Sequence, residues 1–381
     1  MTRRREQVRT MLEAHWVPEG YAAPNSQVYP WQWLWDSCFH SIIWAELDRP
    51  ERAMIELASA LSTQDAHGFV PHMNYVRHPE FHASLWGRTG SSSITQPPMY
   101  GHTIAMLRSR GIEPPVDTVR RANAGLRFLL ERRRRHVASN LVLLAHPWET
   151  GCDDSPRWDD LCLGGPFDLV RWKQRKVELV EAIDADAVGS PIGNHAFQVA
   201  SVGFNALVAF NAFELGLEAP GLCDALDERF NVASSTWIDA GETEHGSGRA
   251  RTLDGLLPVL VERVPARARR VLETALDDQA YGGLYGPAGV HRAEPSFAPS
   301  TYWRGPTWPQ LAYLLWIAAR RHGFATLAHE LAVRTVAGAF RSDLAEFWNP
   351  DTGEGLGAIP QSWTGLAWVM AEAEGLSDPA G

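Results

Sequence analysis

The segment LDRPERAMIELASALSTQ, residues 47–64, decides the fold class because it has the features of a short amphipathic helix. Pro50 suits the first turn of a helix, and the side chain of Asp48 can cap that turn. Apolar residues then recur at the spacing that places them on one helical face: Met54, Leu57, Ala58 and Leu61. The segment therefore predicts a helix with one buried stripe.

The same pattern recurs along the chain. Residues 194–216 (NHAFQVASVGFNALVAFNAFELG) predict a longer helix that ends at Gly216, and residues 304–323 begin near Pro306 and end at Gly323. Further helices are expected near residues 3–15, 34–47, 97–110, 115–135, 170–183, 219–229, 264–277, 324–341 and 362–374. The best strand candidate is VASNLVLLAH, residues 137–146. The sequence predicts an all-α fold.

Length and composition limit the class of protein. No low-complexity linker divides the 381 residues, so we expect a single domain over residues 1–381. The net charge of −10 argues against a nucleic-acid partner, and no apolar run is long enough to cross a membrane. Four scattered cysteines without CxxC spacing, and a start without a secretory signal, predict a cytoplasmic protein without a zinc site. Homo-oligomerisation stays open.

Several loops are much richer in aromatic and acidic residues than the others. Each is punctuated by Pro or Gly, and most precede a predicted helix: residues 29–37, 67–75, 94–100, 146–159, 300–309 and 346–363. A toroid of helical hairpins would gather such loops at one end, where functional groups are usually carried. The alternative is that these aromatic side chains only plug one end of a helical barrel.

Acids crowd two of these loops. HPWETGCDDSPRWDD, residues 146–160, holds Glu149, Asp153, Asp154, Asp159 and Asp160, and the other loop holds Glu346, Asp351 and Glu354. Glycoside hydrolysis needs one protonated and one ionised carboxyl group, and crowding or burial raises the pKa of one of them. Aromatic neighbours suit the apolar faces of a sugar. Alternatively, the acids only cap or solvate turns.

Four motifs, in order along the chain, resemble glycoside hydrolase family 63. They are YPWQWLWDSCFH (29–40), HPWETGCDDSPRWD (146–159), YWRGPTWPQLAYLL (302–315) and EFWNPDTGEGLG followed by SWTG (346–365). The ordered set is far more specific than any one motif. Within the family, the chain resembles the short bacterial members, which include hydrolases of mannosylglycerate and glucosylglycerate.

The resemblance implies an (α/α)6 barrel and an inverting α-glycosidase that hydrolyses a small α-glucoside or α-mannoside. The substrate would be like glucosylglycerate or mannosylglycerate, or a short α-gluco-oligosaccharide. The resemblance places the general acid on Asp153 and the general base on Glu346. An inverting enzyme holds these carboxyl groups about 6.5–9.5 Å apart, which leaves room for a water molecule.

The resemblance also assigns sugar contacts. The expected substrate-binding residues are Tyr29, Trp33, Trp35, Asp36, Gln96, Trp148, Arg157, Tyr302, Trp303, Gly305, Trp308 and Gln361. For each tryptophan, a place in the core is an equally good interpretation. No cofactor or metal is expected, although a structural calcium stays open.

The sequence departs from the family pattern at four positions. Phe347 and Trp348 stand where tyrosines are usual, Cys152 where methionine is common, and Asp154 where asparagine is common. Asp154 would raise the pKa of Asp153 if both were buried. The basic segment RWKQRK, residues 171–176, could meet a carboxylate aglycone, but a solvated helix face is the favoured interpretation.

Two other functions remain open. Sugar epimerases and isomerases on α/α barrels use histidine pairs, and the chain offers His40, His72, His82, His102, His146 and His195. A non-catalytic sugar-binding protein is the second alternative, and a metal site at His146, Glu149 and Asp153 is a weak third hypothesis. We expect Asp153 and Glu346 to face one cavity, and the histidines not to pair there, if the chain is a glycosidase.

Overall fold

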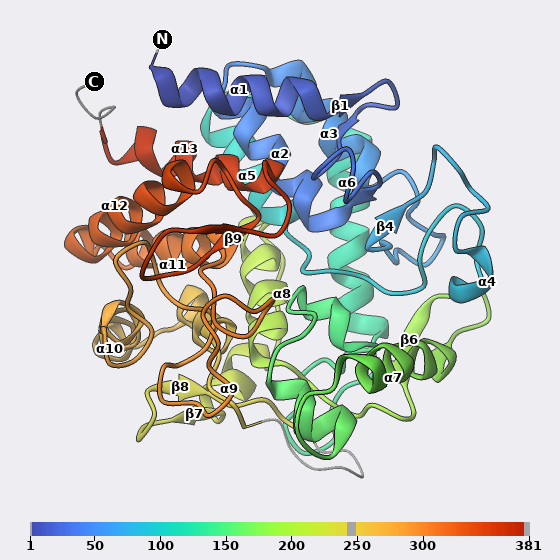
Figure 1. The fold of residues 1–381 in the computed structure, drawn as a ribbon. Helices are drawn as coiled ribbons and strands as arrows, with labels where there is room; N and C mark the ends of the chain where they lie inside the picture. Colours follow the sequence, from blue (N-terminus) through green and yellow to red (C-terminus); the bar gives the residue numbers. More distant parts are fainter. Residues whose placement is uncertain (1, 242–248, 377–381) are drawn as a thin grey trace.

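The computed structural model describes residues 2–241 and 249–376 and is mostly helical (Figure 1). The α-helices are α1 (Arg3–His15), α2 (Leu34–Glu46), α3 (Pro50–Ala60), α4 (Ala83–Trp86), α5 (Tyr100–Ser109), α6 (Val116–Arg127), α7 (Leu169–Glu181), α8 (Val202–Glu214), α9 (Leu222–Asp227), α10 (Pro265–Leu276), α11 (Pro309–Arg321), α12 (Ala325–Arg341) and α13 (Leu366–Ala373). The 3₁₀ and π segments are η1 (Phe128–Arg132), η2 (Pro147–Thr150), η3 (Asp159–Leu163), η4 (Leu253–Val261) and η5 (Ser362–Gly365). The predicted helical class is confirmed.

The strands are short and pair only in twos within the loops. The antiparallel pairs are β1 (Trp16–Val17) with β2 (Tyr21–Ala22), β3 (Gln32–Trp33) with β4 (Met73–Asn74), β5 (Ile183–Ala185) with β6 (Pro191–Asn194), β7 (Phe230–Asn231) with β8 (Thr236–Trp237), and β9 (Phe347–Trp348) with β10 (Gly355–Leu356). The predicted strand at 137–146 is wrong, since this segment makes only an isolated bridge between Arg135 and Val142. Its apolar residues 141–145 are buried as irregular chain.

The helices contact one another in a closed order. The order is α2, α5, α8, η4, α11 and α13, and α13 packs back onto α2. A second helix packs on each of these six segments: α3 on α2, α6 on α5, α9 on α8, α10 on η4, α12 on α11 and α1 on α13. Figure 1 shows α8 near the middle of the molecule, with α10, α12 and α1 toward its outside.

Burial explains which segments take the inner positions. Every residue of α2 is buried, and so are most residues of α8 and α11, because most of their residues are apolar or small. In contrast, α6 and α10 bury one face and expose arginines on the other. A helix gains the most free energy from burial when most of its surface is apolar, so such helices occupy the inner positions.

Several local predictions differ from the structure. The helix expected over 194–216 begins only at Val202, because Asn194 lies in β6 and Ser201 caps the helix through its side chain. Asp48 does not cap α3, since it has a positive φ of 58° and Arg49 occupies the cap position. Of the predicted stripe, Leu57 and Leu61 are buried, whereas Met54 and Ala58 are only partly buried. Ala53, Glu56 and Ala60 complete the buried face of α3.

Within the described residues, no helix is both long and apolar enough to cross a membrane. The cytoplasmic location stays a prediction.

We predict that Gly101→Ala destabilises the protein, because α5 passes very close to α8 at this glycine. A Cβ at Gly101 would lie 2.4 Å from the backbone oxygen of Asn211 and 3.0 Å from its Cα. Overpacking of this kind costs about 1–3 kcal/mol, which exceeds the usual gain from alanine in a helix. Thermal or denaturant unfolding measures the change. The matched control is Gly165→Ala, where nothing lies within 4 Å, and an equal loss in both variants would contradict the prediction.

Candidate active site

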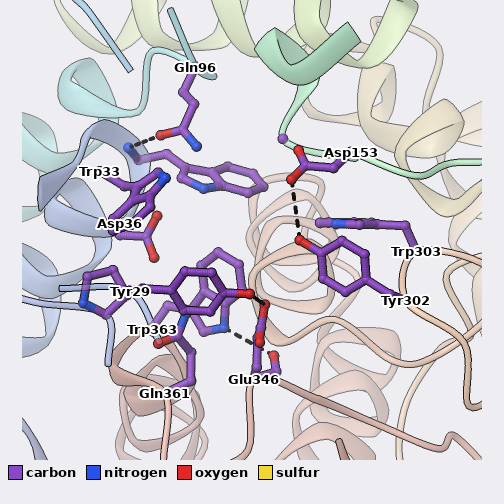
Figure 2. A pocket seen from close by; sticks show the side chains of 13 residues that line it. Tyr29, Trp33, Asp36, Gln96, Asp153, Tyr302, Trp303, Glu346, Gln361 and Trp363 are labelled. Atoms are coloured by element: carbon purple, nitrogen blue, oxygen red, sulfur yellow. Dashed lines mark hydrogen bonds between the residues drawn. The ribbon is translucent and has the colours of Figure 1, made fainter. Parts of the chain in front are cut away.

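One pocket collects residues from most of the aromatic and acidic loops. Its lining is Pro24, Tyr29, Trp33, Trp35, Asp36, Gln96, Gly151, Asp153, Tyr302, Trp303, Glu346, Gln361 and Trp363 (Figure 2). The pocket has an empty volume of about 380 Å³, including its mouth.

The first wall is the start of α2 and the chain before it. Trp33 ends β3 and precedes α2, so Trp35 and Asp36 lie in the first turn of that helix. Gln96 joins this wall, because its Oε1 accepts a hydrogen bond of 3.3 Å from the backbone N–H of Trp35. Burial and the nearby Glu346 carboxylate raise the pKa of Asp36 well above its usual range. A protonated Asp36 could donate a hydrogen bond, whereas an ionised one could only accept.

The acid-bearing loop enters the pocket directly after η2. Gly151 has a φ of 71°, and a Cβ there would lie 2.5 Å from the ring of Trp35. A glycine is therefore required for the loop to pass so close to the indole. This turn brings Asp153 to the pocket, and Figure 2 shows Asp153 and Glu346 on different sides of the same open space.

Asp153 lies in surroundings that favour its protonated form. Burial, together with the nearby Asp154 and Glu346 carboxylates, raises the pKa of Asp153 to about 7, against the lowering effects of Lys176 and of the Tyr302 hydroxyl. The hydroxyl of Tyr302 lies 3.3 Å from Oδ2 of Asp153. A carboxyl group with a pKa near neutrality can release or take up a proton at physiological pH.

Glu346 is more deeply buried and has more donors. Its Oε1 accepts a hydrogen bond from the hydroxyl of Tyr29 (3.1 Å), and its Oε2 accepts one from the backbone N–H of Ala358 (2.9 Å). Burial raises the pKa of Glu346 to about 7, against the lowering effect of these two donors. Both donors stabilise the ionised form specifically.

Indole rings make the floor and the far wall. Trp303 lines the pocket and stacks on Trp308 at 3.6 Å between ring centroids and 5° between planes. Trp308 is fully buried behind it and also contacts Trp363, whose Nε1 donates to the backbone oxygen of Glu346 (3.1 Å). The aromatic wall therefore also fixes the backbone that carries Glu346.

Buried arginines hold the acid-bearing loop in place. Arg157 pairs with Asp239 at 2.5 Å and with Asp254. Arg304 donates to the backbone oxygen of Asp154 (3.2 Å) and pairs with Asp159, so it ties this loop to the chain of Tyr302 and Trp303. The irregular loop is thus anchored by charged hydrogen bonds, the strongest kind available.

The structure brings most of the predicted site residues together. The pocket lining includes Tyr29, Trp33, Trp35, Asp36, Gln96, Asp153, Tyr302, Trp303, Glu346 and Gln361. Four predicted sugar-binding residues lie outside this lining: Trp148, Arg157, Gly305 and Trp308. Trp148 packs in a separate cluster against Trp86, and Arg157 is occupied by its two aspartates.

Three lining residues were missed by the sequence interpretation: Pro24, Gly151 and Trp363. Gly151 and Trp363 belong to motifs that carried the resemblance, so a stricter use of the motifs would have included them. Pro24 has no such signal.

No histidine is among the described residues that line the pocket. His72 and His146 are buried, and burial lowers the pKa of each to about 3, so they stay neutral. His102 is hydrogen-bonded to Tyr313 at 2.9 Å. An acid–base pair of histidines at the pocket, as a sugar epimerase would need, is therefore not present in the part of the chain described.

The metal hypothesis at His146, Glu149 and Asp153 is wrong. Across residues 2–241 and 249–376, no group of three His, Cys, Asp or Glu side chains is placed to hold an ion. Glu149 instead accepts hydrogen bonds from Arg133 and from the backbone N–H of Thr95 and Ala145.

The basic segment 171–176 lies in α7 and does not form a uniformly solvated face. Arg171 donates to the backbone oxygen of Leu163, and Arg175 pairs with Glu178. Lys176 is largely buried and pairs with Asp154 at 3.1 Å. For Lys176, the favoured interpretation of a solvated cation is wrong.

Comparisons with known proteins agree with the motifs. The family model described as "Mannosylglycerate hydrolase MGH1-like glycoside hydrolase domain" matches residues 29–364. The chain is 28% identical to a mannosylglycerate hydrolase from Thermus thermophilus, over 90% of this chain and 94% of the relative. It is also 28% identical to a glucosylglycerate hydrolase from Mycolicibacterium hassiacum, over 89% of this chain and 91% of the relative.

A solved structure has a similar fold. The crystal structure of a family 63 mannosylglycerate hydrolase from Thermus thermophilus, in complex with glucose, superposes with a TM-score of 0.79. The match has 25% sequence identity and covers 97% of this chain and 99% of the other.

We predict that Arg157→Met acts on stability, not on substrate affinity. The change leaves Asp239 and Asp254 buried without their shared cation, and breaking a buried ion pair in this way costs about 3–5 kcal/mol. The free energy of unfolding measures the loss, and KM measures any effect on substrate binding. Adding Asp239→Asn removes one unpaired charge and should recover part of the stability. A normal unfolding free energy with a raised KM would instead give Arg157 a substrate-binding role.

Proposed function

Because the chain belongs to the mannosylglycerate hydrolase MGH1-like family of glycoside hydrolases, we propose that it is an inverting α-glycosidase for a small α-glucoside or α-mannoside. The resemblance to glycoside hydrolase family 63 is confirmed, and the chain is a glycoside hydrolase. The relatives named for mannosylglycerate and glucosylglycerate indicate the substrate class. A short α-gluco-oligosaccharide is the alternative substrate.

The observation that carries the mechanism is that Asp153 and Glu346 line the same pocket. Glu346 is the proposed base, because Tyr29 and the backbone of Ala358 both donate to its carboxylate and stabilise its charge. Asp153 is the proposed acid, because it has one long hydrogen bond, from Tyr302, and an acidic neighbour in Asp154. One carboxyl group then keeps a proton while the other stays ionised.

In this mechanism, Asp153 donates its proton to the glycosidic oxygen as the bond to the anomeric carbon breaks. Glu346 takes a proton from a water molecule that attacks that carbon from the opposite face of the sugar. The leaving aglycone gains the proton of Asp153, and the sugar gains hydroxide with inverted configuration. We expect a carboxyl separation of about 6.5–9.5 Å in the substrate complex.

The remaining lining suits a single sugar ring. Trp33, Trp35 and Trp303 offer apolar faces, and Asp36 and Gln96 offer polar groups on the same wall. Oε1 of Gln361 and Nε1 of Trp303 are buried at the pocket without a partner in the protein. Sugar hydroxyls would satisfy both atoms, since a buried polar atom without a hydrogen bond is costly.

The proposed scaffold is an (α/α)6 barrel in a single domain over residues 1–381. The closed order of inner segments, each with an outer helix packed on it, supports this architecture. The loops that lead into α2, α5, α11 and α13 supply most of the pocket.

We predict that Asp153→Asn and Glu346→Gln each lower kcat by about 10²–10⁴-fold, because each removes one proton-transfer group. Released sugar is measured with glucosylglycerate and mannosylglycerate, and unfolding curves check that both variants fold. NMR spectra taken during hydrolysis should show the β-anomer of the sugar first. Wild-type rates in either variant would remove the assignment, and an initial α-anomer would exclude inversion.

The pH dependence of kcat/KM should be bell-shaped with a maximum near neutrality. Glu346 must be ionised, and its pKa of about 7 means that activity falls as pH drops below that value. Asp153 must be protonated, and its pKa of about 7 means that activity falls as pH rises above it. Initial rates at low substrate concentration across the pH range test this, and a flat profile from pH 5 to 9 would contradict it.

A further inference from the structure

We propose that Lys176 and Asp154 form a positioning pair behind Asp153, and that their balanced charges set the pH range in which Asp153 keeps its proton. This inference rests on the proposed role of Asp153 as the acid. Neither member of the pair lines the pocket, so both would act through Asp153 and not on the sugar.

The pair has a defined geometry. Nζ of Lys176 lies 3.1 Å from Oδ1 of Asp154, and each side chain is only 12% exposed. The indole Nε1 of Trp172 donates to the same oxygen at 2.7 Å. Trp172 and Lys176 both belong to α7, so this helix presents two donors to one carboxylate.

Indole rings keep water away from the ammonium group. Nζ of Lys176 lies 5.1 Å from the ring centroid of Trp148 and 5.3 Å from that of Trp172. A cation over aromatic faces is stabilised by the ring electrons, but it is poorly hydrated and weakly screened. Removing either charge should therefore change the pKa of the neighbouring Asp153 carboxyl group.

Asp154 transmits the effect because it is the next residue after Asp153. Its backbone oxygen accepts a hydrogen bond of 3.2 Å from Arg304, which fixes the peptide between the pocket and α7. The Asp154 carboxylate raises the pKa of Asp153, and the Lys176 ammonium lowers it. The two effects oppose each other while both charges are present.

Other charged or titratable groups also lie near the pair and near Asp153. Around Asp153 they are Glu346, Tyr302, Tyr29, Asp36 and Cys152. Around the pair they are Arg304, which is bound to Asp159, and His146, which lies against the backbone oxygen of Lys176 and stays neutral. None of them replaces the charge of Lys176 or of Asp154 when that charge is removed.

The test removes each charge singly and then both together, and it measures the pH at which kcat/KM falls on the basic side of its profile. This basic limb reports the deprotonation of Asp153. Lys176→Met leaves Asp154 unbalanced, so the limb should move to higher pH by about 0.5–1 unit. Asp154→Asn keeps an oxygen for Trp172 but leaves Lys176 unbalanced, so the limb should move to lower pH by about the same amount. The double variant should return the limb close to its wild-type position.

Two further variants separate charge from packing. Lys173→Met removes an exposed lysine from the same helix and should leave the profile unchanged. Lys176→Arg keeps the charge and should keep the limb in place, even if stability falls. KM should change little in every variant, because the pair does not line the pocket.

The outcomes are distinguishable from failure of the proposed function. A wild-type protein that hydrolyses no α-glycoside overturns the function itself. An active protein in which both single variants move the limb in the same direction, or not at all, overturns the pair alone. If a single variant fails to fold, the carboxyl ¹³C chemical shift of Asp153, titrated in the remaining variants, decides the direction of the shift.

Discussion

The burial of carboxyl groups around one small pocket is the constraint on which the rest of the site depends. An ionised carboxylate removed from water is costly unless donors or cations meet it. Glu346 accepts hydrogen bonds from Tyr29 and from the backbone of Ala358, while Tyr302 is the one hydrogen-bond donor to the Asp153 carboxyl group among the described residues. The fold therefore gives the two acids unequal support, and unequal support is what acid–base catalysis requires of a carboxyl pair.

The same constraint explains why the acidic residues within 146–160 have different roles. Glu149 is bound by Arg133, Asp154 by Lys176 and Asp159 by Arg304, and Asp160 is exposed. Among the described residues, Asp153 alone in this loop is both at the pocket and without an ion pair. Crowding does not itself make an acid reactive; the cations that neutralise its neighbours leave one acid that can hold a proton.

Local sequence located several helices closely, including those with a clear apolar periodicity. The predicted spans 3–15, 264–277 and 324–341 lie within a residue of α1, α10 and α12, because apolar spacing specifies an amphipathic helix locally. The segment η4 was missed because it is short, apolar on all sides and interrupted by Pro258. The apolar run 137–146 was taken for a strand, since periodicity cannot separate a strand from buried irregular chain.

Within a motif, sequence indicates which residues belong to the site but not which way each side chain points. Trp303 and Trp308 come from one motif, yet Trp303 lines the pocket and Trp308 lies behind it. The Arg157 side chain points toward Asp239 and Asp254, with which it forms ion pairs. Both aspartates are distant in the sequence, so the motif around Arg157 does not indicate this contact. Lys176 is the clearest example. Its basic segment predicts a solvated helix face, but in the structure Lys176 pairs with Asp154 and lies against two indole rings. Side chains that act through a neighbour are therefore the hardest to find from sequence, since their function depends on a tertiary contact rather than on their own chemistry.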